Sequence, residues 1–166
     1  MILQENIGEA CLMKESYFKS VVMIERLHRL FLEVMKVELE RMGIWDISNT
    51  QCLILYNVGR GQVAVGDLKN FGYYLGSNVT YNLSKMLENK YVLQERNTHD
   101  RRSRHVKLSE KGLALYNKLD KLLTRHTKAL PHEGVDAARL DELDGLLTSL
   151  EGFWKGLLTR REGHDY

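Results

Sequence analysis

Six large apolar residues near the end of this chain recur at alternating spacings of three and four residues. They are Leu140, Leu143, Leu147, Leu150, Trp154 and Leu157. Positions a and d of a seven-residue helical repeat have these spacings, and such a repeat forms a seam between helices. The pattern predicts a helix over residues 136–158. We expect a second copy of the same chain to cover this seam, which is the predicted dimer interface.

A second long helix is expected near the start of the chain, where residues 14–42 contain neither proline nor glycine. Apolar residues recur there at helical spacing, among them Ile24, Leu27, Phe31 and Val34. The 166 residues include a single proline, so few positions prevent helix formation. This length suits one domain with helical extensions.

Shorter elements are predicted between these two helices. Ser48 and Gln51 have the spacing of a capping box, which predicts a short buried helix through Cys52 and Tyr56 that ends near Gly59. Further helices are predicted over residues 64–71, 77–89 and 109–130, and strands over residues 91–96 and 105–108. On the 109–130 helix, Leu115, Leu119 and Leu122 line one side.

The positive charge is concentrated in residues 85–111, which hold eight basic and four acidic side chains. The whole chain carries a formal net charge of only +2. A local basic region on a balanced protein is typical of a nucleic-acid contact surface, although a solvated basic hairpin would have the same composition.

The helix over residues 77–89 has two chemically different faces. Val79, Leu83, Met86 and Leu87 form the apolar face, and the predicted opposite face carries Asn78, Tyr81, Asn82 and Lys85. Amide, phenol and ammonium groups can contact base edges and phosphates. The connection between the two predicted strands ends in arginines, which can reach the phosphate backbone or the minor groove.

Three helices followed by a basic hairpin are the elements of a winged helix-turn-helix, in which the last of these helices enters the major groove. At this point the chain resembles the MarR (multiple antibiotic resistance regulator) family. The resemblance lies in the run Lys-Met-Leu-Glu-Asn-Lys-Tyr-Val at 85–92, Asp100-Arg101-Arg102 in the hairpin, and Leu108-Ser109-Glu110-Lys111-Gly112 after it. The turn at residues 71–78 is longer than the Leu-Gly-Leu-Ser turn of the family, so the register of the base-facing residues stays open.

The resemblance implies a mainly α (α+β) fold, a winged helix-turn-helix with long N- and C-terminal dimerisation helices. Residues 1–43 would be the N-terminal dimerisation helix, 44–112 the DNA-binding domain and 113–166 the C-terminal dimerisation helices. It also implies a homodimer that binds a pseudo-palindromic double-stranded DNA site and regulates transcription, with repression expected. The expected major-groove residues are Ser77, Asn78, Tyr81, Asn82 and Lys85. The expected wing residues are His99, Asp100, Arg101, Arg102, Ser103 and Arg104, with Asp100 orienting a neighbouring arginine or simply forming the turn.

The resemblance further implies regulation by a small aromatic or anionic effector. His28, Arg29, Trp45 and Tyr56 are candidate pocket residues, because they are polar or aromatic side chains on otherwise apolar helices. Core or interface packing is the alternative role of these four residues. Redox sensing by Cys11 is another alternative, and Cys52 is predicted to be a small core residue.

Other classes of function have little support in the sequence. There is no phosphate-binding glycine loop, nucleophile elbow or metal-ligand cluster among the six histidines, so we expect neither an enzyme nor a metal or other cofactor. A non-specific architectural DNA-binding protein remains an alternative. The chain has no long uncharged apolar run, no basic leader region and only two cysteines, which favours a cytoplasmic protein without membrane contact.

Overall fold

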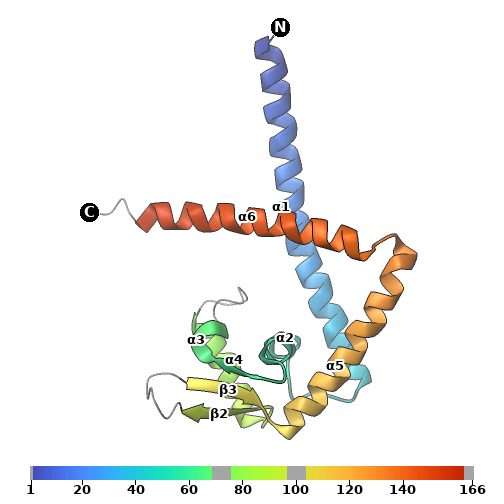
Figure 1. Cartoon of the computed structure of the whole chain (residues 1–166), viewed down its shortest axis with the longest axis vertical. Coiled ribbons are helices and arrows are strands. Elements are labelled where there is room, and N and C mark those ends of the chain that lie inside the picture. Colours follow the sequence, from blue (N-terminus) through green and yellow to red (C-terminus); the bar gives the residue numbers. More distant parts are fainter. Residues whose placement is uncertain (1, 69–75, 97–103, 163–166) are drawn as a thin grey trace. The chain divides into compact units, whose positions relative to one another are not determined.

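The computed structural model describes residues 2–68, 76–96 and 104–162, which form mostly helices and one small sheet (Figure 1). The elements are α1 (Ile2–Arg41), α2 (Asn49–Val58), β1 (Gln62–Ala64), α3 (Val65–Leu68), α4 (Gly76–Glu88), β2 (Val92–Arg96), β3 (Arg104–Leu108), α5 (Glu110–Ala129), the 3-10 helix η1 (Leu130–Glu133) and α6 (Ala137–Glu162). The chain divides into two compact units, residues 1–116 and 117–166. The expected mainly helical class with a small antiparallel sheet is confirmed.

Helix α1 begins earlier than the apolar pattern predicts. It starts at Ile2, about three turns before the predicted residue 14, and ends at Arg41 as expected. No proline interrupts residues 2–13, so the helix continues there although the apolar stripe is less regular.

The predicted capping box at the start of α2 is confirmed. The backbone N–H of Gln51 donates to Ser48 Oγ at 3.2 Å, and the Ser48 N–H donates to Gln51 Oε1 at 3.1 Å. At the other end Gly59 adopts a φ of 62°, a backbone conformation that glycine adopts without the steric cost of a Cβ.

The sheet has the strand order β1-β3-β2, and both pairings are antiparallel. In the hairpin Val92 lies opposite Leu108 and Arg96 opposite Arg104. Strand β1 was not predicted, because a three-residue strand has too short a pattern to recognise. Its backbone is organised by pairing with β3, where Val63 lies opposite Val106.

The core of the first unit lies between the sheet and the helices that pack on it. Helix α4 contacts β2, and α2 contacts both β3 and α4. Leu55, Val79, Met86, Val92 and Val106 are almost completely buried. Burial of several large apolar side chains contributes about 1.5–3 kcal/mol each, which fixes α4 beside the hairpin (Figure 1).

Pro131 and Gly134 separate α5 from α6, as the sequence indicates. Pro131 lies in the first turn of η1, and Gly134 ends it with a φ of 74°. On α5 the predicted apolar row Leu115, Leu119 and Leu122 is buried. In the ranges that the structure describes, no helix is apolar enough over a sufficient length to cross a bilayer.

Candidate nucleic-acid interface

Helix α4 presents a polar face to solvent and an apolar face to the core. Asn78, Thr80, Tyr81 and Ser84 are exposed, and the Tyr81 side chain is 61% accessible. Val79, Leu83 and Met86 are buried, as the helical spacing predicts. Ser77 lies in α4, but its side chain is outside the described residues. Thr80 and Ser84 were not among the predicted contact residues, although their spacing of four places them on one face.

The predicted exposure of Asn82 is wrong. Its side chain is only 9% accessible and accepts a hydrogen bond from Gln51 Nε2 at 3.2 Å. Asn82 Nδ2 in turn donates to the Asn78 carbonyl oxygen at 2.9 Å. Asn82 follows buried Val79 by three residues and precedes buried Met86 by four, so it lies on the core side of the helix. Asn82 therefore forms a buried hydrogen bond that connects α4 to α2.

Lys85 lies at the edge of the polar face of α4. Its ammonium group contacts Glu88 Oε2 at 2.7 Å, one turn further along the helix. The hydrogen bond and the charge of Glu88 raise the pKa of Lys85, so the side chain is a cation at neutral pH. Because the pair is solvent-exposed, Lys85 can exchange Glu88 for a phosphate at low cost.

The base of the wing adjoins the polar face of α4. Arg104 is exposed at the start of β3 and, with Thr80 and Ser84, borders a cavity of about 100 Å³. Gln94 of β2 also lines this cavity. Helix α4 and the base of the wing therefore present hydroxyl, amide and guanidinium groups around one cavity, which is also lined by the apolar residues Val65, Leu83, Leu87 and Val106. The other expected wing residues, His99, Asp100, Arg101, Arg102 and Ser103, lie outside the described residues.

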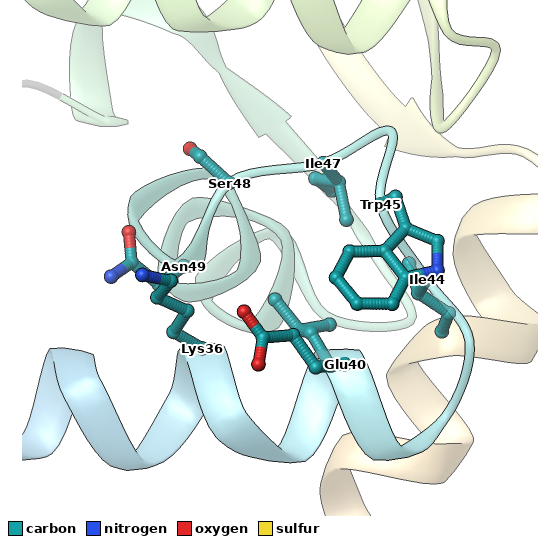
Figure 2. Close-up of a pocket in the computed structure, with 8 residues that line it drawn as sticks. Lys36, Glu40, Ile44, Trp45, Ile47, Ser48 and Asn49 are labelled. Carbon is teal, nitrogen blue, oxygen red and sulfur yellow. The ribbon is translucent and has the colours of Figure 1, made fainter.

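The described cavity beside Trp45 is not lined by the other three candidate effector residues. Trp45, 73% accessible, borders a cavity of about 260 Å³ between the end of α1 and the start of α2. Figure 2 shows its indole beside Ile44, with Glu40 and Lys36 on the neighbouring turns of α1. The described residues that line this cavity include neither His28, Arg29 nor Tyr56.

The other three candidates have different surroundings. Tyr56 stacks on Tyr116 with ring centres 5.0 Å apart, and the Arg60 guanidinium lies 5.4 Å from the centre of the Tyr116 ring. His28 and Arg29 are exposed on α1, where Arg29 forms an i,i+4 ion pair with Glu25. Of the four candidates, Trp45 lines the cavity in Figure 2, and the grouping of the four residues in one effector pocket stays a prediction.

The two cysteines have opposite environments. Cys11 is exposed on α1, and Cys52 is completely buried on α2. Burial raises the pKa of the Cys52 thiol to about 12, which fits the predicted role of a core residue. Within the described ranges no three His, Cys, Asp or Glu side chains are grouped so that they could hold a metal ion.

The apolar seam on α6 is largely uncovered in the single chain. Leu140, Leu143, Leu147 and Leu157 are 37–47% accessible, and Leu150 and Trp154 are half-buried. Leu146, Phe153 and Leu158 of the same helix are also exposed. Exposed apolar area on this scale is typical of an interface.

The described geometry is that of a winged-helix DNA-binding protein: a polar helix face beside a basic hairpin on a three-stranded sheet. Residues 47–112 match the family described as a winged helix DNA-binding domain. The transcriptional activator ExpG of exopolysaccharide II synthesis from Rhizobium meliloti strain 1021 is 32% identical over 139 residues, covering 84% of this chain and 72% of that protein.

Solved structures with the same fold include a mutant of E. coli MarR complexed with operator DNA. Its TM-score is 0.63 at 19% identity, with 77% of this chain and 90% of that chain covered. AbsC of Streptomyces coelicolor, a MarR family regulator, has a TM-score of 0.67 at 19% identity, with 86% of this chain and 94% of that chain covered. The chain belongs to the MarR family of winged-helix transcription regulators, as the sequence motifs indicated. The family and the fold are those of regulators that bind DNA.

Proposed function

We propose that this regulator binds a pseudo-palindromic duplex site as a homodimer, with α4 of each protomer in a major groove and each wing on the adjacent backbone. The observation that carries this proposal is that exposed Thr80 and Ser84 on the polar face of α4 border the same cavity as exposed Arg104 of the wing. The structure of E. coli MarR with operator DNA, which has the same fold, supports it.

The base-facing set of α4 is revised by the burial of Asn82. Ser77, Asn78, Tyr81 and Lys85 remain proposed contacts, and exposed Thr80 and Ser84 join them. Hydroxyl and amide groups can read base edges, and Lys85 can bind guanine or a phosphate. Asn82 instead holds α4 against α2 and has no proposed contact with a base.

The wing supplies sequence-independent affinity in this proposal. Arg101, Arg102 and Arg104 would neutralise phosphates, with His99 and Ser103 as further donors and Asp100 orienting one arginine. Contacts of this kind fix the register of the protein on the duplex, while α4 carries the sequence preference.

Dimerisation would use the two terminal segments, residues 1–43 and 113–166. The uncovered seam of α6 supports this assignment, as do exposed apolar residues of α1 such as Phe18, Leu27 and Leu30. A two-fold axis would set the two α4 helices about 34–36 Å apart, one turn of B-DNA.

Selection of bound sequences from a random duplex library tests this function. We expect an enriched pseudo-palindrome whose half-sites are separated by about 10–10.5 base pairs. Enrichment of a single, asymmetric motif would contradict the dimer. No enrichment over random duplex would contradict sequence-specific binding and favour the architectural alternative.

The direction of regulation is tested with a reporter fused to the selected site. Repression, expected from the family resemblance, predicts higher expression when the regulator is deleted. The relative ExpG is named a transcriptional activator, and activation predicts lower expression on deletion.

Regulation by a small aromatic or anionic effector is supported by the cavity beside Trp45. The indole face suits an aromatic ring. Lys36 at the same cavity can pair with a carboxylate, in competition with Glu40, which lines the cavity as well. A phenolic acid that binds there would raise the melting temperature of the protein in proportion to the logarithm of its concentration. Trp45→Ala should remove that shift, and an unchanged melting temperature in the parent protein would exclude this ligand class.

Redox control through Cys11 is the alternative mode of regulation, because Cys11 is exposed. DNA affinity measured before and after mild peroxide treatment separates the two modes. Loss of affinity that Cys11→Ser abolishes would favour redox control, and insensitivity to peroxide would exclude it.

A further inference from the structure

A hydrogen-bonded cluster surrounds the turn that connects the recognition helix to the wing. Helix α4 ends at Glu88, and β2 begins at Val92. Two residues of the turn between them bind Asp46. Tyr91 Oη donates to Asp46 Oδ1 at 2.6 Å, and Asn89 Nδ2 donates to the Asp46 carbonyl oxygen at 2.5 Å. Asp46 belongs to neither element, because it lies in the loop between α1 and α2.

The start of α5 completes this cluster. The Lys111 ammonium forms an ion pair with Asp46 Oδ2 and donates to the Asn89 carbonyl oxygen at 2.9 Å. It also lies 4.1 Å from the centre of the Tyr91 ring, a cation–π distance. Asp46 thus accepts hydrogen bonds from the α4–β2 turn and from α5 at once.

The same turn is also held by Ser109, which directly precedes α5. Lys90 has a φ of 61°, a left-handed conformation that residues other than glycine rarely adopt. Ser109 Oγ donates to the Lys90 carbonyl oxygen at 2.5 Å, and the Ser109 N–H donates to the Tyr91 carbonyl oxygen at 3.0 Å. An unfavourable backbone conformation persists where neighbouring contacts determine it, and Ser109 and Lys111 supply those contacts.

Charge strengthens the cluster. Hydrogen bonds from Lys111 and Tyr91 lower the pKa of Asp46, so the carboxylate is ionised at neutral pH. Tyr91 is 3% accessible and its pKa is raised by burial and by the Asp46 charge, so its hydroxyl remains a donor. Hydrogen bonds to a charged partner are stronger than those between neutral groups.

The position of this turn links the cluster to DNA binding. The chain leaves α4, which carries the polar face, and enters the wing within three residues. The direction of the hairpin relative to α4 therefore depends on residues 89–91. We propose that Asp46 is a positioning residue for DNA binding, which holds this turn so that α4 and the wing contact the same duplex together. The inference rests on the DNA contacts of the proposed function.

A positioning role and a purely stabilising role predict different results. A variant that only unfolds some of the protein lowers the active concentration, but each folded molecule still neutralises the same number of phosphates. A variant that misdirects the wing neutralises fewer phosphates even when it is folded. The slope of log affinity against log salt reports that number, at about 0.9 per phosphate, and does not depend on the folded fraction.

The experiment compares the full-length parent protein with Asp46→Asn, Tyr91→Phe, Lys111→Met and the double variant Asp46→Asn/Lys111→Met. The probe is the site selected from the random library, titrated at several salt concentrations. We expect Asp46→Asn to weaken binding about 2- to 30-fold and to reduce the salt slope by about 0.9 for each phosphate that the wing no longer reaches. The double variant should bind no more weakly than the weaker single variant, because both changes break one cluster.

Tyr91→Phe removes a single donor and keeps the buried ring, so it remains informative if Asp46→Asn fails to fold. Like Asp46→Asn, it should reduce the slope of log affinity against log salt. Glu151→Gln is the matched control, because it removes one carboxylate from the exposed Lys155 ion pair on α6. This control should keep the affinity and the slope of the parent protein.

Unchanged salt slopes in Asp46→Asn and Tyr91→Phe, with a parent protein that binds its site, would overturn the positioning role. If the loss of affinity in the double variant equals the sum of the two single losses in free energy, Asp46 and Lys111 do not act as one cluster. Failure of the proposed function is a separate outcome, because the parent protein itself would then show no preference for the selected site.

Discussion

Burial gives the two cysteine residues different reactivity. The Cys52 thiol is completely buried and its pKa is raised to about 12, whereas Cys11 is exposed. Because the thiolate is the reactive form, we expect one thiol per chain to react quickly with an aromatic disulfide reagent at pH 8. The second should react only on unfolding. Two fast thiols, or a fast thiol that survives Cys11→Ser, would contradict the buried environment of Cys52.

The raised pKa of Cys52 also sets a direction for the pH dependence of stability. Above pH 9.0, the ordinary pKa of a cysteine thiol, the unfolded chain releases the Cys52 proton while the folded protein retains it. The contribution of Cys52 to the free energy of unfolding is therefore complete below pH 9. It declines as the pH rises from 9 towards about 12. Urea unfolding at pH 8 and pH 10 should give a lower free energy of unfolding at the higher pH, and a higher value would contradict this assignment.

Gly112 is required by a close approach of the backbone. A Cβ at this position would collide with the Tyr91 carbonyl oxygen, which is backbone and cannot rotate away. We expect Gly112→Ala to lower the free energy of unfolding by about 1–3 kcal/mol in urea. Gly66→Ala is the control, since nothing lies within 4 Å of a Cβ there. Equal effects of the two substitutions would contradict the close approach.

At the scale of elements, the hydrogen bond between Gln51 of α2 and Asn82 of α4 predicts that Asn82 contributes to stability and not to DNA recognition. Asn82→Ala leaves the buried Gln51 amide without its acceptor, so we expect a decrease of about 1–3 kcal/mol in the free energy of unfolding. The base preference of the folded protein should stay unchanged. Tyr81→Ala, at an exposed position of the same helix, should weaken DNA binding with little change in stability. A relaxed base preference in Asn82→Ala would restore this residue to the base-contacting set.

The wing is tested through Arg104, the predicted wing contact whose side chain the structure describes. Arg104→Ala should weaken binding to all duplexes and reduce the salt slope by about 0.9 for each phosphate that Arg104 neutralises. Lys118→Ala, which removes an exposed cation from α5, is the matched control and should leave the slope unchanged. Equal slopes for both variants would place Arg104 outside the interface.

At the scale of the whole molecule, the seam of α6 predicts association. Leu147 lies in the apolar repeat, and Thr148 is an exposed neighbour outside it. Leu147→Glu should convert a dimer at micromolar concentration into a monomer, because a charge at the centre of an apolar interface is left unpaired. Thr148→Glu should remain dimeric. Light scattering after size exclusion measures both, and a monomeric parent protein would refute the homodimer.

Patterns within short segments of the sequence were enough to predict most helices and strands and the family. The capping box of Ser48 and Gln51, the apolar rows of α4 and α5, and the two strands of the hairpin depend on spacings within one segment. Such spacings reflect helical and strand periodicity, which is a property of the sequence itself.

Tertiary packing decided the details of the site. Whether Asn82 faced DNA or α2 depended on where Gln51 lay, 31 residues earlier in the chain. Strand β1 needed β3 as its partner, and the cluster at Asp46 joins three segments separated by up to 65 residues. The sequence determined which side chains could be polar contacts or apolar core. Only the fold decided which polar groups found partners inside the protein and which stayed exposed to solvent, because that choice depends on contacts between distant segments.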